Sequence, residues 1–291
     1  MPVIGRFAPS PSGPLHFGSL VAAMGSYCQA RAQNGQWILR IEDVDTPRVV
    51  PTASDQILQD LETFGFYWDG PVFYQSQNFE QYQFYLDELI GNELAYACRC
   101  SRKQLRDGGA EYGPLGQIYP GFCRDEQLLI NNHSIRLMTK NASKITFVDP
   151  VYGSVNLDIP IDIGDVVLKR VDQIYAYHLA VVVDDHLQGI TEVVRGEDLL
   201  NNTPLHIYLQ NRLEFQTPDY LHLPLVNNAD GVKLSKQTGA AALDKTKVSK
   251  QLIAALDHLG QQTNELEDKM RPCDILSFAV SNWCVSKINA S

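Results

Sequence analysis

Two short stretches of the sequence carry residues that could bind a polyphosphate. The first is a turn-rich loop at residues 5–19, GRFAPSPSGPLHFGS, between a short apolar segment and a helical pattern. A helix that begins after such a loop exposes unpaired N–H groups and a partial positive charge. Gly13 and Gly18 would let a ligand approach the backbone closely, while His16 and Ser19 would add side-chain donors. Taken alone, the same pattern also fits a surface loop with an incidental histidine.

The second stretch is KLSKQ at residues 233–237, which follows a predicted strand and the turn at residues 228–231. Lys233 and Lys236 are three residues apart, so both side chains could reach one polyphosphate. Two ammonium groups there would stabilise the charge that develops during attack at an α-phosphate. A solvated basic loop is the alternative for this pentapeptide on its own.

The elements that would position these loops alternate between strand and helix in the first third of the chain and again after residue 176. Hydrophobic periodicity predicts strands at residues 3–7, 37–41, 165–170, 190–194 and 221–226. It predicts helices at residues 17–33, 53–64 with Thr52 as cap, 176–185, after Pro204, 248–259 and 273–283. Residues 95–175 break the alternation and contain a hairpin near Tyr152-Gly153. The pattern favours a parallel α/β sheet with an α+β insertion.

Composition limits the class of protein. The 291 residues carry a net charge of −10 and are 44% hydrophobic, which suits two domains or one domain with an insertion. No apolar run reaches the roughly 18 residues of a membrane span, and the start lacks the pattern of a signal peptide. We therefore expect a cytoplasmic monomer with no membrane partner. The acidic balance argues against a general nucleic-acid coat protein, but not against RNA bound at a local basic face.

The six cysteines, without secretory context, suggest reduced thiols or metal ligands rather than disulfides. Cys98 and Cys100 stand on one side of a glycine-rich loop and Cys123 on the other. Thiolates bind zinc strongly, but three of them are an incomplete set, so spacing alone leaves zinc and buried free thiols equally open. The other cysteines lie on helical patterns and are predicted to be packing residues: Cys28, Cys273 and Cys284.

The two phosphate-binding stretches together resemble the HIGH and KMSKS motifs of class I aminoacyl-tRNA synthetases. They read HFGS at residues 16–19 and KLSKQ at residues 233–237. More narrowly, RFAPSPSG at residues 6–13 and RIEDVD at residues 40–45 resemble the opening and the RIEDTD segment of glutamyl-tRNA synthetases. Further segments resemble that family in the same order, namely AVVVDD at residues 180–185 and VVRGED at residues 193–198.

This resemblance implies a ligase that joins L-glutamate to ATP, with Mg²⁺, and passes the acyl group to a tRNA hydroxyl. The residues suit that chemistry, because Arg6 can pair bidentately with a side-chain carboxylate and Glu42 can hold an α-ammonium. Arg195 is expected to meet a carboxylate. The implied catalytic residues are His16, Ser19, Lys233 and Lys236. The implied glutamate-binding residues are Arg6, Ala8, Ser10, Glu42, Tyr177 and Arg195, and the implied ATP-binding residues are His16, Gly18, Ser19 and Lys236.

One departure from the family concerns the acceptor. Full-length glutamyl enzymes continue with a large helical domain that reads the anticodon, whereas about fifty residues follow Lys236 in this sequence. The chain therefore resembles the truncated branch of the family, which transfers glutamate to the queuosine base at the wobble position of tRNA(Asp). The anticodon stem-loop would then be the RNA partner. Two alternatives remain, namely a truncated enzyme that charges a tRNA 3′ end and a non-catalytic paralogue that binds RNA or another partner.

The same resemblance implies a fold and a metal site. The expected fold is α/β, with a Rossmann-like parallel sheet of the class I type, an inserted α+β domain that contains zinc, and a short helical C-terminal segment. The expected parts are residues 1–92 and 176–242 for the two halves of the catalytic domain, 93–175 for the insertion and 243–291 for the helical segment. Tyr119 would join Cys98, Cys100 and Cys123 as the fourth ligand of one structural Zn²⁺.

Overall fold

The computed structural model describes residues 2–227 and 241–290. Two blocks of parallel strands lie at its centre: β1 (Ile4–Phe7), β2 (Gln36–Ile41) and β3 (Phe73–Tyr74), and β11 (Glu192–Gly196) with β12 (Asp219–Leu223). The N–H of Thr191 donates to the carbonyl of Ile4 at 3.0 Å, so β11 runs beside β1. The predicted parallel arrangement is confirmed. These strands are short and apolar, as is typical of a sheet buried on both faces.

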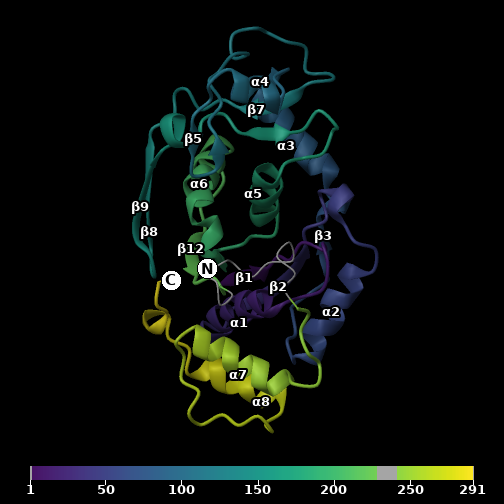
Figure 1. Ribbon diagram of the computed structural model, residues 1–291, viewed down its shortest axis with the longest axis vertical. Helices are drawn as coiled ribbons and strands as arrows, with labels where there is room; N and C mark the ends of the chain where they lie inside the picture. The colour runs from purple at the N-terminus through teal and green to yellow at the C-terminus, as the bar shows by residue number, and fades with distance from the viewer. Residues whose placement is uncertain (1, 228–240, 291) are drawn as a thin grey trace.

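The first hydrophobic core packs this sheet against four helices, α1 (Phe17–Ala32), α2 (Ala53–Thr63), α7 (Val248–His258) and α8 (Pro272–Ser281). Trp37, Leu39 and Ile41 of β2 are fully buried in it. Figure 1 shows α7 and α8 at one end of the elongated molecule, next to α1. Thr52 precedes α2 as predicted, but its side chain makes no cap hydrogen bond.

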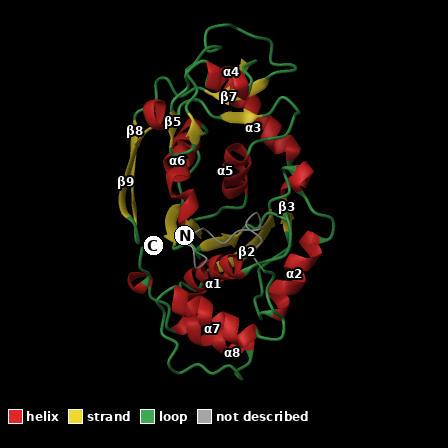
Figure 2. Cartoon of the chain, in the orientation of Figure 1, coloured by secondary structure: helices red, strands yellow, loops and turns green. Residues whose placement is uncertain are grey.

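The second core belongs to the middle of the chain. It packs α3 (Phe79–Gly91), α5 (Tyr177–Leu187) and α6 (Thr203–Arg212) against an antiparallel sheet of β4 (Ala95–Cys98), β7 (Ser134–Leu137) and β10 (Val167–Lys169). A long hairpin of β8 (Lys144–Asp149) and β9 (Gly153–Asp158) flanks α6, as Figure 2 shows. The predicted hairpin and the α+β character of this region are confirmed. The exact domain boundaries stay a prediction.

Some expectations were wrong or incomplete. Helix α3 and the short α4 (Arg102–Asp107), β5 (Tyr112–Gly113) and β6 (Gly116–Gln117) were not predicted. Cys28 is buried in α1 as expected, but Cys273 is exposed on α8 and Cys284 lies beyond the end of that helix. Helical periodicity does not by itself say which face a helix buries. Within the described ranges, no helix has the length and apolar character needed to cross a membrane.

The proline-rich loop between β1 and α1 is held from both sides. The carbonyl of Pro9 accepts from the N–H of Glu42 at 3.0 Å, and the carbonyl of Pro11 accepts from the N–H of Val50 at 2.9 Å. The carbonyl of Leu15 accepts from the N–H of Leu243 at 3.0 Å. These three backbone hydrogen bonds tie the loop to neighbouring segments. The loop is therefore a fixed wall beside the end of β2.

Candidate functional site

A cavity of about 660 Å³ opens beside the carboxyl ends of β1 and β2. Ser10, Glu42 and Tyr177 are among the residues that line it, so the structure brings together three of the residues predicted to bind glutamate. Arg48 and Arg170 line its outer part. Ligands of open α/β sheets bind at this edge, because the strand ends leave a crevice there.

Two predicted residues, Arg6 and Arg195, lie behind this cavity instead of lining it, with side chains in the buried interior. Arg6 Nε donates to Asp185 Oδ1 at 3.1 Å, and its Nη1 donates to the carbonyl of Val194 at 3.3 Å. A carboxylate ligand would therefore have to use the remaining N–H groups of Nη1 and Nη2. The predicted bidentate pairing is restricted to that end of the guanidinium.

Asp185 is the common partner of two buried arginines. Besides Arg6, it accepts from Arg40 Nη2 at 2.6 Å. Burial alone would raise the pKa of this carboxyl, but Arg6 and Arg40 hold the pKa below its usual value. Asp185 and Arg40 stand in the segments that carry the family resemblance, yet sequence reasoning gave neither of them a role. No sequence spacing could show that α5 would meet the ends of β1 and β2.

The neighbouring residue, Asp184, points from a different side of α5. It accepts from Gln75 Nε2 at 2.7 Å, from Asn78 Nδ2 at 2.9 Å and from the hydroxyl of Tyr82. Successive side chains on a helix point about 100° apart, so one aspartate binds the α3 region and the next binds the sheet. The pair fixes α5 between the two cores.

Two carboxylates line the cavity, Glu42 and Asp45, and Asp45 is paired with Arg48 and Arg170. Burial raises the pKa of Glu42 to about 7, against the opposing pull of Arg40 and Arg6. Near neutral pH this group therefore changes charge. Its position at the end of β2 follows directly from the strand QWILRI, which ends one residue earlier at Ile41.

Arg195, at the end of β11, uses all five of its N–H groups. Its Nη1 lies 3.4 Å from the hydroxyl of Tyr177, and its remaining contacts are to His206, His222, Thr203 and the carbonyl of Leu199. The contact with Tyr177 is the longest of these. It is also the one that points toward the cavity, because Tyr177 lines the cavity.

The residues predicted to bind ATP line a separate cavity of about 200 Å³. His16, Gly18 and Ser19 lie there at the beginning of α1, across from Gly196 and Asp198. His16 Nδ1 accepts from the N–H of Ser19 at 3.3 Å and so caps the helix. Lys233 and Lys236 lie outside the described residues.

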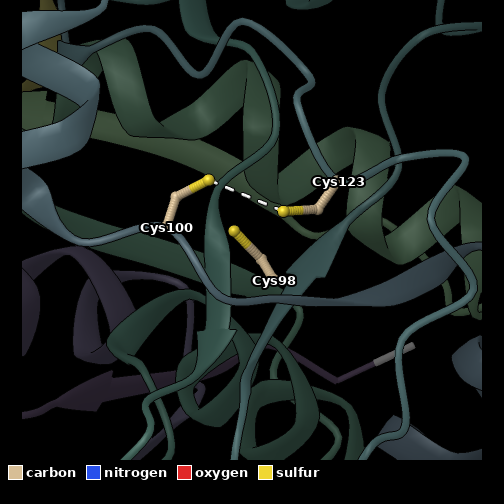
Figure 3. A group of neighbouring side chains, drawn as sticks. All are labelled: Cys98, Cys100 and Cys123. Carbon is tan, nitrogen blue, oxygen red and sulfur yellow. Dashed lines mark hydrogen bonds between the residues drawn. The ribbon is translucent and has the colours of Figure 1, made fainter.

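The predicted metal ligands lie together in the insertion, far from α7 and α8 (Figure 1). The sulfurs of Cys98, Cys100 and Cys123 are within 4.8 Å of one another and point toward a common centre, as Figure 3 shows. The Sγ atoms of Cys100 and Cys123 are 3.5 Å apart. Tetrahedral zinc with bonds of about 2.3 Å places its sulfur ligands roughly 3.8 Å apart. The cluster therefore has dimensions that suit a metal ion.

Tyr119 joins this cluster through its hydroxyl. The oxygen is 3.3 Å from Cys98 Sγ and 3.5 Å from Cys100 Sγ, and it accepts from the N–H of Cys123 at 2.9 Å. Arg136 supports the group from outside, since its Nε donates to Cys98 Sγ at 3.2 Å and its guanidinium carbon lies 4.0 Å from the Tyr119 ring centroid. The predicted four residues are thus in contact.

Comparisons with known proteins show the family of this chain. The family described as tRNA synthetases class I (E and Q), catalytic domain, matches residues 2–267. A Dechloromonas aromatica protein named glutamyl-Q tRNA(Asp) synthetase is 48% identical over 283 residues, covering 97% of this chain and 94% of its own length. The protein of the same name from Klebsiella pneumoniae is 46% identical over 288 residues, covering 99% and 96%.

A solved structure of a glutamate tRNA ligase from Elizabethkingia meningosepticum, in complex with its amino acid, has a similar fold. Its TM-score is 0.80 at 24% sequence identity, and the match covers 100% of this chain and 66% of that one. A glutamate-tRNA synthetase from Elizabethkingia anophelis gives a TM-score of 0.79 at the same identity. This likeness shows the arrangement of the elements, namely the class I synthetase fold.

We predict that Asp185→Asn lowers the free energy of unfolding by about 3 kcal/mol, because it leaves two buried guanidinium groups without their carboxylate. Urea denaturation at pH 7 measures this. Since the pKa of Asp185 lies below its usual value, its contribution is complete at neutral pH and is lost only as the pH falls below about 4. Asp172→Asn, which removes a surface partner of Arg170, is the matched control and should change little. Equal effects of the two substitutions would contradict the role of Asp185.

Proposed function

The chain belongs to the class I tRNA synthetases of the glutamate and glutamine group, among the glutamyl-Q tRNA(Asp) synthetases, and from this membership we propose its reaction. The glutamate α-carboxylate attacks the α-phosphorus of ATP and releases pyrophosphate. A hydroxyl of queuosine, at the wobble position of tRNA(Asp), then attacks the activated carbonyl and releases AMP. The observation that carries this proposal is the identity of 46–48% over nearly the whole chain to proteins of that name. The enzyme is accordingly a ligase.

In the proposed amino-acid pocket, opposite charges are matched. The free N–H groups of Arg6 bind the side-chain carboxylate, and Glu42 binds the α-ammonium. Tyr177 contacts the substrate, while Arg195 supports the Tyr177 hydroxyl from behind at 3.4 Å. Ala8 and Ser10 come from the fixed loop after β1 and close one side. Of this set, the two arginines are buried and held by other residues of the chain.

In the proposed nucleotide site, His16, Gly18 and Ser19 receive the phosphates of ATP. The N-terminus of α1 supplies backbone N–H groups and a partial positive charge to the same anion. Lys236 and Lys233 would stabilise the transferring α-phosphate from the KLSKQ segment. Mg²⁺ enters with ATP and neutralises phosphate charge. The acceptor step needs the ring hydroxyl to be positioned against the carbonyl more than it needs a protein base.

We also propose that the cysteine cluster holds one structural Zn²⁺. Cys98, Cys100, Cys123 and Tyr119 would be its ligands, and when bound it would supply folding free energy to the insertion. The support is the convergence of three thiols and one phenol oxygen at distances suited to zinc. The N–H of Cys123 donates to the Tyr119 oxygen and so helps to hold it beside the three thiols.

The acceptor is tested with tRNA from cells that can or cannot make queuosine. The full chain, with ATP, Mg²⁺ and labelled glutamate, should label only the tRNA that contains queuosine, and label should stay on the anticodon stem-loop after nuclease digestion. Equal labelling of both tRNAs, or label at the 3′ end, would favour a truncated enzyme that charges tRNA ends. No glutamate-dependent ATP–pyrophosphate exchange would favour a non-catalytic paralogue.

We predict that kcat/KM for glutamate in pyrophosphate exchange rises as the pH increases through about 7. The pKa of Glu42 is about 7, and only its ionised form pairs with the α-ammonium. The raised pKa of Glu42 has the opposite consequence for the free energy of unfolding, because the folded state favours the protonated carboxyl. This contribution to stability is complete below about pH 4.3 and is lost as the pH rises through 7. Glu42→Gln should lower kcat/KM by roughly a hundredfold and flatten the profile. A rise that persists in the variant would exclude Glu42 as its cause.

We predict one zinc per chain by metal analysis of the purified protein. Cys123→Ser should reduce that content and lower the melting temperature, because a thiolate ligand is lost. Tyr119→Phe keeps three thiolates and should bind zinc more weakly. Cys273→Ser is the control, since this exposed thiol lies on α8. Zinc content that is unchanged in Cys123→Ser would contradict the assignment.

A further inference from the structure

A chain of buried polar side chains runs behind the cavity, from the β8–β9 hairpin to the end of β11. Asp149, the last residue of β8, contacts His222 of β12 through Oδ2, at 2.8 Å from Nδ1. His222 Nε2 lies 3.2 Å from Nε of Arg195. Asp149 and His222 are 1% and 0% exposed, so water does not replace these contacts. Neither residue lines the two cavities described above.

The carboxylate of Asp149 is fully occupied. Its Oδ1 accepts from the N–H groups of Val151 and Tyr152 at 2.9 and 3.0 Å. Its Oδ2 accepts from both the backbone N–H and Nδ1 of His222. Although burial alone would raise the pKa of Asp149, these donors hold the pKa below its usual value. Asp149 is therefore a fixed anion that closes the hairpin and orients one imidazole.

These partners determine the tautomer of His222. Because Nδ1 faces a carboxylate, it carries the proton, and Nε2 is left as an acceptor. That acceptor receives Nε–H of Arg195 and lies 3.1 Å from the hydroxyl of Thr203. The opposite tautomer would place an N–H of His222 against an N–H of Arg195. The orientation of the guanidinium thus depends on where the His222 proton sits.

On its other side, the guanidinium of Arg195 contacts a second neutral imidazole, that of His206. Its Nη1 lies 3.2 Å from His206 Nδ1, and His206 Nε2 lies 3.1 Å from His178 Nδ1. Burial and the nearby Arg195 lower the pKa of His178 to about 4 and keep the pKa of His206 well below its usual value. Among the residues the structure describes, Arg195 forms no direct ion pair with a carboxylate. Its nearest compensating charge in this chain of contacts is Asp149, reached through His222.

We propose that Asp149 is a positioning residue for the amino-acid pocket, acting through the tautomer of His222 to hold the guanidinium of Arg195 behind Tyr177. The hairpin of the insertion would then be coupled to glutamate binding in the catalytic half. This inference rests on the proposed function, because it assumes that the pocket binds glutamate. It adds to that function a residue that does not touch the substrate.

The first test replaces the imidazole and follows ATP–pyrophosphate exchange. His222→Leu removes the acceptor and should raise KM for glutamate roughly tenfold, with KM for ATP unchanged. His222→Gln can place an amide oxygen near the position of Nε2, so its increase should be much smaller. A purely structural role would shift the melting temperature in both variants without this difference. Equal KM values for glutamate in the two variants would overturn the proposal.

The second test asks whether Asp149 acts through His222. In Asp149→Asn, the amide oxygen can keep the hydrogen bonds from Val151 and Tyr152, and the amide N–H then faces Nδ1 of His222. This should favour the tautomer of His222 that carries its proton on Nε2. We expect a roughly tenfold rise in KM for glutamate in the wild-type background and little further change when His222→Gln is already present. Asn156→Ala, an exposed change in the same hairpin, controls for general perturbation. Additive effects in the double variant would overturn the coupling.

The measurements on the wild-type chain and on the variants distinguish the proposed function from the positioning role of Asp149. If the wild-type chain shows no glutamate-dependent exchange, the proposed function is wrong. If the wild-type chain exchanges pyrophosphate but His222→Leu and Asp149→Asn keep the wild-type KM for glutamate, the proposed function stands and the positioning role is wrong. If Asp149→Asn does not fold, the comparison of His222→Leu with His222→Gln still decides whether the acceptor on residue 222 matters.

Discussion

The architecture of the site depends on one carboxylate, Asp185, shared by Arg6 and Arg40. Three segments distant in sequence contribute these charges, namely β1, β2 and α5. Burying two guanidinium groups is tolerable only when each has a partner, so the ends of both strands must lie against α5. Arg40 and Arg6 also lower the pKa of Glu42, whereas burial raises it. The resulting pKa of Glu42 is about 7. The same two arginines therefore hold the strand ends against α5 and influence the charge of a carboxyl in the cavity.

The insertion separates the two halves of the sheet along the chain, and α5 brings them back together. Asp184 binds Gln75, Asn78 and Tyr82, on the side of the second core, while Asp185 binds the sheet. Because the two carboxylates are adjacent on one helix, a movement of α5 would disturb both sets of contacts. Asp149 adds a second tie, from the hairpin to β12. The hairpin of the insertion is thus tied to the sheet.

Much of the fold could be predicted because periodicity is a local property. The strand QWILRI is visible in six residues and the helix that begins at Phe17 in sixteen. Helix α3 was missed because its sequence, FEQYQFYLDELIG, mixes aromatic and polar residues, and only packing against α5 shows which face is buried. The grouping of Cys98, Cys100 and Cys123 with Tyr119 was anticipated from the family resemblance, because spacing alone left a metal site and free thiols equally open. The roles of Asp185, Asp149 and His222 could not, since each depends on contacts across more than seventy residues.

Fixed arginines also explain how such a pocket could distinguish glutamate from glutamine. The guanidinium of Arg6 is held by Asp185 and the carbonyl of Val194, so it cannot turn away from a mismatched ligand. A guanidinium presents only donors, and an amide places an NH₂ group where a carboxylate places a second oxygen. With glutamine, the amide NH₂ group would then face an N–H of Arg6, and neither donor would have an acceptor. An unpaired buried donor costs binding free energy. Rigidity of the arginine, supplied by partners that never touch the ligand, is what makes the mismatch costly.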